Sequence, residues 1–324
     1  MRVIYASLIL NAVALVLKTY AVLHSTSSAV DAEFLHTLGD FIGSALLATG
    51  AALMFRKPSM KYPFGFGRTP YVLGLISTSI IGGFLFTISL SAGISRLVGG
   101  GTVTATQGAL VTLLAASVAD ATILVWAAKE HKSNSEDPAV KGTIVENLSD
   151  LVGDVAAISS VLTVNPTIDA YGAFIISGIL LFSAISLGYR YFNVLIGRAA
   201  PKNVIGRAVK VAVAIPGVID VNDVKSLVIG PDQYLLIMEV EAREDASVEE
   251  LERIREELRE RLQDAEPRVK YLIVEFVPPR APPATFRDLL RKIVRMGEVG
   301  ELCTGIDKSV TFNEIPFSHE LCNG

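Results

Sequence analysis

The chain has 324 residues, of which 51% are hydrophobic and only 19% are charged, a composition too apolar for an ordinary soluble enzyme. The formal net charge of −4 is small and argues against a nucleic-acid partner. Both cysteines, Cys303 and Cys322, lie near the C-terminal end, so no disulfide framework is expected to hold the fold.

Apolar stretches dominate the first 200 residues. Six of them are long enough to cross about 30 Å of hydrocarbon as helices. The first could be a secretory signal, but its length suits a membrane span better. The fifth contains three carboxylates, which share one helical face in an otherwise apolar segment. The sequence therefore predicts an α-helical membrane protein with a six-helix transmembrane bundle in residues 1–198, with spans at 3–23, 33–55, 70–94, 107–128, 140–164 and 170–193.

Basic residues are concentrated in alternate loops, which predicts the orientation in the membrane. They follow the second, fourth and sixth predicted spans, and the other loops are nearly free of them, with Arg96 the main exception. The positive-inside rule then places both termini in the cytoplasm. The residues concerned are Arg56, Lys57, Lys61, Arg68, Lys129, Lys132, Lys141, Arg190, Arg198 and Lys202.

The composition changes near residue 199. A helix at 203–215 is followed by strands at 218–229 and 234–242, a helix that begins at the capping box of Ser247 and Glu250, and a strand at 269–277. The order αββαβ predicts a ferredoxin-like α+β domain over residues 199–280, cytoplasmic in the predicted orientation. Beyond a proline-rich linker, residues 281–324 hold a basic helix at 286–295 and a loosely ordered tail.

Two pairs of metal-competent side chains lie inside predicted spans. His36 and Asp40 are four residues apart in the second span, and Glu146 and Asp150 are four apart in the fifth. Residues i and i+4 share one face of a helix, so two such helices can bring one imidazole and three carboxylates together. Each ionisable group at bilayer depth costs about 2.5–3.5 kcal/mol, which calls for a functional reason.

The ligand set predicts a divalent-cation site. One nitrogen and three oxygens can form a tetrahedral Zn²⁺ site, and the excess of oxygen also suits Mn²⁺, Fe²⁺ or Co²⁺. The three carboxylates cannot all be ionised together at low dielectric, so the empty site is expected to hold protons that metal binding releases. The alternative is that a neighbouring helix neutralises each charge, with Lys18 as the obvious partner.

Other candidate groups carry less weight. Asp120 and Asp154 are further intramembrane carboxylates. They could line the path by which the ion reaches the site, or they could have a structural hydrogen-bonding role, and the two alternatives are equally open. Asp31 and Glu33 are interpreted as solvated charges at the mouth of the second span. The tail residues Cys303, His319 and Cys322 could form a soft metal site, but they are only three.

These residues together resemble the cation diffusion facilitator (cation efflux) family over about residues 1–279. Similarity lies in segment 28–40, which ends in the His36/Asp40 pair, in the aromatic and glycine-rich loop 61–68, in segment 146–150, in Asp169, and in Ile-Pro-Gly-Val at 215–218. The resemblance implies a homodimeric six-span metal/proton antiporter of the cell membrane that dimerises through its cytoplasmic domain. It implies no cofactor beyond the transported ion.

The chain departs from the family pattern at two places. Glu146 replaces the usual histidine of the fifth span, and Gly197 stands where some members have an acidic residue. The resemblance therefore does not imply the family's metal preference for this chain. It also does not imply the ion pair that some members form at the dimer interface.

Two rival functions remain open at this point. A membrane-bound metal sensor would bind the same ions without transporting them. An intramembrane metalloenzyme would need a general base, but no His-Glu-x-x-His pattern is present, and Glu146 is needed as a ligand. The sequence therefore favours a transporter that is not an enzyme.

Overall fold

The computed structural model describes residues 2–133 and 138–279. Its contacts divide the chain into two units, Met1–Gly197 and Arg198–Gly324, and each is considered by itself. The basic helix predicted at 286–295 and the tail with Cys303, His319 and Cys322 lie outside the described residues.

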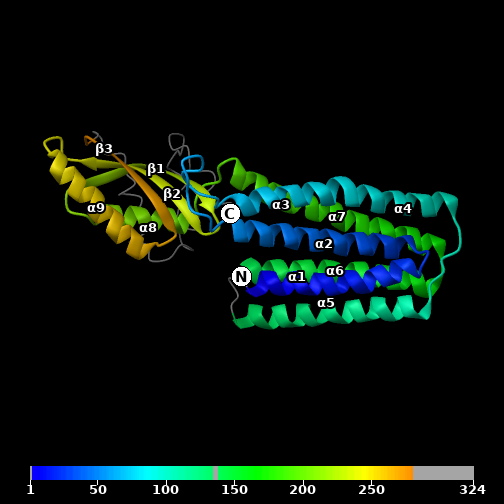
Figure 1. The fold of residues 1–324 in the computed structure, drawn as a ribbon. Helices are drawn as coiled ribbons and strands as arrows, with labels where there is room; N and C mark the ends of the chain where they lie inside the picture. The colour runs from blue at the N-terminus through cyan, green and yellow to red at the C-terminus, as the bar shows by residue number, and fades with distance from the viewer. Residues whose placement is uncertain (1, 134–137, 280–324) are drawn as a thin grey trace, which may run out of the picture. The chain divides into compact units, whose positions relative to one another are not determined.

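The first unit is built from long helices that run side by side (Figure 1). They are α1 (Arg2–Leu23), α2 (Ser28–Leu53), α3 (Thr69–Ile80), η1 (Ile81–Leu85), α4 (Phe86–Gly99), α5 (Gln107–Ser133), α6 (Pro138–Thr163) and α7 (Pro166–Leu195). The segments α3, η1 and α4 follow one another without a break, and η1 is a π-helical segment. Helices occupy all six predicted windows.

Three helical stretches are long and apolar enough to cross a membrane by length and composition, among the residues that the structure describes. They are Thr69–Gly99, Gln107–Val125 and Pro166–Leu195. The number of six spans stays a prediction, because buried charges lower the hydropathy of the helices that would supply the others. The α-helical membrane fold with a small C-terminal α+β unit is confirmed.

Helix α2 is the centre of the first unit and contacts α1, α3, α4, α6 and α7. Small residues allow this close packing, since Ala29 and Ala32 of α2 are fully buried against Ala173 and Ile176 of α7. The helix begins at Ser28, five residues before the predicted span, with Ser27 as its N-cap. The Ser27 hydroxyl accepts a hydrogen bond from the backbone N–H of Val30.

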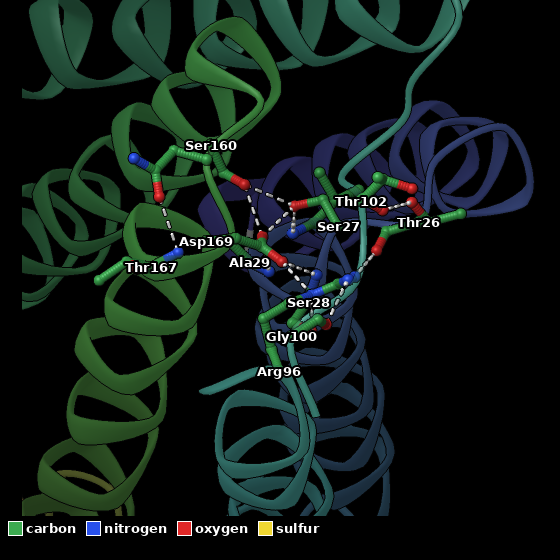
Figure 2. A network of polar contacts seen from close by, with 12 residues as sticks. Thr26, Ser27, Ser28, Ala29, Arg96, Gly100, Thr102, Ser160, Thr167 and Asp169 are labelled. Carbon is green, nitrogen blue, oxygen red and sulfur yellow. Dashed lines mark hydrogen bonds and ion pairs between the residues drawn. The ribbon is translucent and has the colours of Figure 1, made fainter. Parts of the chain in front are cut away.

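A network of polar contacts around Asp169 ties four helices together at the α2 N-terminus (Figure 2). The fully buried carboxylate of Asp169, in α7, accepts hydrogen bonds from the backbone N–H groups of Ser28 and Ala29, at 2.9 and 3.0 Å. It also accepts from the hydroxyls of Ser27 and Ser160. Its other contact is an ion pair with Arg96 of α4, with Nε 2.8 Å from Oδ2. Arg96, the exception to the charge asymmetry of the loops, is thus a paired structural cation.

We expect Asp169→Asn to lower the stability of the first unit by about 3 kcal/mol, because Arg96 would lose its buried counter-ion and α2 its anionic cap. Thermal unfolding of the purified protein in detergent would measure this. Asp31→Asn is the matched control, since the Asp31 carboxylate lies in the first turn of α2 but makes none of these bonds. Equal unfolding temperatures for both variants would contradict the assigned role of Asp169.

The second unit is a three-stranded sheet with two helices. It contains α8 (Lys202–Val213), β1 (Val218–Gly230), β2 (Gln233–Ala242), α9 (Val248–Ala265) and β3 (Val269–Val277), which confirms the predicted order αββαβ. The sheet order is β1-β2-β3, with β1 antiparallel and β3 parallel to β2. Helices α8 and α9 contact each other and the sheet, and bury an apolar core of Val204, Ala208, Ala212, Val221, Leu236, Met238, Val240, Ile254, Leu258 and Leu262.

Local signals explain the boundaries of these elements. Gly217 has φ +97°, where a Cβ would also meet the Ile254 side chain at 2.8 Å, so a glycine is required after α8. The Ser247 hydroxyl accepts from the Glu250 N–H at 3.2 Å, as a capping box requires. The Glu250 carboxylate instead pairs with Arg243 at 3.3 Å, so only half of the predicted box is formed.

Glu266 is the buried acidic group that follows α9. It is 1% exposed and lies 2.6 Å from Nε of Arg268, whose hydrogen bonds lower its pKa below the usual 4.5. Because the pKa is lower in the folded state, the pair stabilises the unit above pH 4.5 and loses that effect as the pH falls further.

We expect the fragment 198–279 to fold alone, and Glu266→Gln to destabilise it by about 1 kcal/mol at pH 7 and by much less at pH 3. Urea unfolding at both pH values would measure the difference. A penalty that is the same at pH 3 and pH 7 would show that the charge of Glu266 is not what stabilises the unit.

Candidate metal centre

The structure brings three of the four predicted ligands together. His36 and Asp40 lie one turn apart on α2, and Asp150 lies on α6. Nδ1 of His36 is 3.6 Å from Oδ1 of Asp150, and Nε2 is 3.9 Å from Oδ2 of Asp40. One ligand atom from each residue lies within 4.8 Å of the others, and no other such group of His, Cys, Asp and Glu occurs among the described side chains.

The two distances involve different nitrogens of His36, and one ion binds only one of them, so the 4.8 Å limit describes the site. Ligand atoms about 2.0–2.1 Å from a tetrahedral Zn²⁺ are about 3.3 Å apart, so the side chains must move closer together when an ion binds. His36 and Asp150 are buried, at 3% and 8% exposure, and the Asp40 side chain is 22% exposed. The site thus has one imidazole and two carboxylates.

The fourth predicted ligand cannot be placed. Glu146 belongs to α6, four residues before Asp150, but its side chain lies outside the described part of the structure. Its role as a ligand stays a prediction.

Apolar packing encloses the α2 side of the site. Gly39, between the two ligands of α2, is buried, and a Cβ there would lie 3.2 Å from Leu85 and 3.3 Å from Ile81 of η1. These two residues pack with Leu180 and Ala184 of α7. A π-helical segment in a long helix often marks a functional position, and this one packs against the backbone between two ligands.

A second buried charge cluster lies beside the site. The Lys18 ammonium, from α1, is 2.6 Å from Glu33 Oε1, 2.8 Å from Asp154 Oδ1 and 3.8 Å from Asp120 Oδ2. Lys18, Glu33 and Asp154 are at most 1% exposed. Lys18 is therefore the cation that these three carboxylates share.

The interpretation of Glu33 as a solvated rim charge is wrong. Because α2 begins at Ser28, Glu33 lies in the second turn and points into the interior, where it is fully buried. Asp154 and Asp120 are likewise buried, with Lys18 as their cation. Lys18 in the first apolar run was the one signal in the sequence for this cluster.

The described part of the second unit holds no comparable group. Residues 199–280 contain neither His nor Cys, and no cluster of metal ligands is found in the part of this unit that the structure describes. The tail residues Cys303, His319 and Cys322 lie outside the described residues.

Comparison with known proteins identifies the family. The model of the cation efflux transmembrane domain matches residues 4–196, more than half of the chain. The chain belongs to the cation efflux family. This is a family of transporters, and the chain is an integral membrane protein.

Curated relatives of the cation efflux family align with both units. The proton-coupled zinc antiporter SLC30A9, mitochondrial, of Xenopus laevis is 27% identical over 260 residues, which cover 74% of this chain and 46% of that protein. Metal tolerance protein C4 of Arabidopsis thaliana is 26% identical over 235 residues, which cover 67% of this chain and 51% of that protein. The chain thus spans about half the length of the curated relatives it matches.

Solved structures match about a quarter of the chain. A MamM CTD variant in its nickel form is 21% identical and covers 25% of this chain and 100% of its own, with a TM-score of 0.24. A second MamM CTD variant is 23% identical and covers 24% of this chain and 95% of its own, with a TM-score of 0.23.

Proposed function

We propose that this member of the cation efflux family exports a divalent transition-metal ion from the cytoplasm in exchange for protons. The metal site is formed by His36, Asp40, Glu146 and Asp150. Zn²⁺ is the first choice, and Mn²⁺, Fe²⁺ or Co²⁺ are further substrates. The proposal rests on one observation: an imidazole and two carboxylates from two helices converge within 4.8 Å.

The relatives support both the ion and the coupling. One is named as a proton-coupled zinc antiporter and another as a metal tolerance protein. The mixed nitrogen and oxygen ligands of this chain fit Zn²⁺ and also harder ions.

Proton exchange follows from the chemistry of the ligands. Metal ions bind deprotonated carboxylates and neutral imidazole, so binding releases the protons that the empty site holds. If the site opens to one side of the membrane when metal is bound and to the other side when protons are bound, the same side chains couple the metal flux to the proton flux.

The orientation and the assembly are part of the proposal. The segment that connects α2 to α3 is basic and contains Arg56, Lys57, Lys61 and Arg68. At the opposite end of the continuous α3–η1–α4 stretch, Arg96 is paired with Asp169. This asymmetry supports cytoplasmic termini in the cell membrane. A homodimer, with the second unit as its dimerisation domain, rests on the family resemblance, and native mass spectrometry in detergent would test it.

Uptake into proteoliposomes tests the proposed transport. Purified protein is reconstituted with a pH dye inside, and Zn²⁺, Mn²⁺, Fe²⁺, Co²⁺ and Mg²⁺ are added in turn outside. We expect protein-dependent Zn²⁺ uptake with proton movement in the opposite direction. Metal binding without flux would indicate a sensor and overturn the transport proposal, and flux without proton movement would overturn the exchange.

Glu146 is predicted to broaden the metal selectivity. With Asp40, Glu146 and Asp150 ionised, the site carries −3 before and −1 after a divalent ion binds, which disfavours a strictly tetrahedral, fully deprotonated state. We expect Glu146→His to lower the Mn²⁺-to-Zn²⁺ uptake ratio about tenfold in competition assays. Glu146→Gln, which removes the charge without adding an imidazole, is the control. An unchanged ratio in Glu146→His would mean that this residue does not set selectivity.

A further inference from the structure

The Glu33 carboxylate touches both the Lys18 cluster and the candidate metal centre. Its Oε1 lies 2.6 Å from the Lys18 ammonium, within hydrogen-bond distance. Its Oε2 lies 3.9 Å from Nδ1 of His36, one turn further along α2. Glu33 is fully buried, so neither oxygen has bulk water as an alternative partner.

The two atoms that face each other have no other hydrogen-bond partner. Glu33 Oε2 and His36 Nδ1 both lack one among the described residues, although both are buried. Buried polar atoms without a partner are rare, because each costs about 1–3 kcal/mol. A donor and an acceptor left unpaired 3.9 Å apart can satisfy each other through a small rotation of the imidazole.

Space for the Glu33 carboxylate is provided by a glycine of α6. A Cβ built at Gly153 would overlap with Glu33 Oε2. Because the Lys18 ammonium fixes one oxygen and the Gly153 backbone bounds the other, the carboxylate is held in place next to His36. Such a fixed acceptor can orient an imidazole.

Metal-binding histidines usually donate their second ring N–H to a carboxylate or carbonyl, which fixes the tautomer and raises the basicity of the ligating nitrogen. Here Nε2 of His36 faces Asp40, and Nδ1 faces Glu33 and Asp150. Asp150 is a candidate ligand, so the bound metal would engage its oxygen. Glu33 is then the carboxylate that remains to accept from Nδ1–H.

We propose that Glu33, held by Lys18 and accommodated by Gly153, is a positioning residue that orients His36 for binding the transported metal through Nε2. This rests on the proposed metal centre and adds a residue that is not itself a ligand. Asp154 provides the matched comparison. It is also fully buried and 2.8 Å from the Lys18 ammonium, but it makes no ion pair with His36.

Equilibrium metal binding separates a positioning role of Glu33 from a purely structural one. Zn²⁺ and Co²⁺ affinities of the full chain in detergent are measured by calorimetry for wild type, Glu33→Ala, Glu33→Gln and Asp154→Ala. We expect Glu33→Ala to weaken binding about 10–100-fold and Asp154→Ala less than threefold. Glu33→Gln, which keeps an acceptor oxygen, should recover part of the loss. The visible d–d bands of bound Co²⁺ should shift in Glu33→Ala and stay unchanged in Asp154→Ala.

Thermal unfolding without metal provides the structural control. Both alanine variants remove one carboxylate from Lys18, so a purely structural role predicts similar losses of stability and of metal affinity in both. Equal metal affinities for Glu33→Ala and Asp154→Ala, or no recovery in Glu33→Gln, would overturn the positioning role. A wild-type chain that binds no metal would instead overturn the metal centre itself.

Discussion

Asp40→Ala and Asp150→Ala are expected to reduce metal uptake into proteoliposomes to the protein-free background. Each variant removes one of the three groups whose ligand atoms lie within 4.8 Å of one another. Losing one oxygen ligand from a site with one nitrogen leaves too few donors to replace the hydration shell of a divalent ion.

The same variants should stay folded. In both variants Lys18 keeps its contacts with Glu33, Asp154 and Asp120, and Arg96 keeps its ion pair with Asp169. No cation is therefore left without a partner, and the loss of a buried charge can even be stabilising. Asp31→Ala, on the same helix, is the control and should transport as wild type does. Wild-type uptake rates in Asp40→Ala or Asp150→Ala would show that the metal does not pass through these residues.

A large loss of stability is expected for Lys18→Met. The Lys18 ammonium is the cation that contacts Glu33, Asp154 and Asp120, and methionine fills similar space without a charge. Breaking a buried ion pair by removing one partner typically costs about 3–5 kcal/mol, because the remaining charge stays desolvated. Thermal unfolding in detergent would measure the change.

The double variant Lys18→Met/Glu33→Gln is the matched control. It removes one positive and one negative charge together, so it should unfold at a higher temperature than Lys18→Met alone. If Lys18→Met unfolds at the wild-type temperature, the cluster does not depend on its ammonium group.

The candidate ligands were predictable because their signal is local. The pairs His36/Asp40 and Glu146/Asp150 follow helical spacing inside apolar segments, and helical spacing alone places each pair on one face. The strands and helices of the second unit were predictable for the same reason. Alternating residues in β2 and the Ser247 cap of α9 are short-range patterns.

The burial of Glu33 was not predictable, because it depends on which helices are neighbours. The second span was predicted to begin at residue 33 with Glu33 at its mouth, because charged groups are usually found outside the hydrocarbon region. The structure begins α2 at Ser28, because Ser27 caps it and Asp169 of α7 binds its first N–H groups. Lys18 then reaches Glu33 across the contact between α1 and α2. No pattern within either segment encodes that contact.

The π-helical segment η1 was also missed. Ile81–Leu85 lies inside the most apolar predicted span, where hydropathy is uniform and a change of helix type leaves no trace. Only the contact of Ile81 and Leu85 with Gly39 relates it to the site.

X-ray absorption spectroscopy of the Zn²⁺-loaded full chain, wild type and His36→Ala, most directly tests whether these residues hold the metal. At one Zn²⁺ per chain, we predict a shell of nitrogen and oxygen at about 2.0–2.2 Å with the multiple scattering of one imidazole. In His36→Ala that imidazole signal, or the bound Zn²⁺ itself, should be lost. A sulfur shell at about 2.3 Å, or an imidazole signal unchanged in His36→Ala, would place the metal elsewhere and contradict the account.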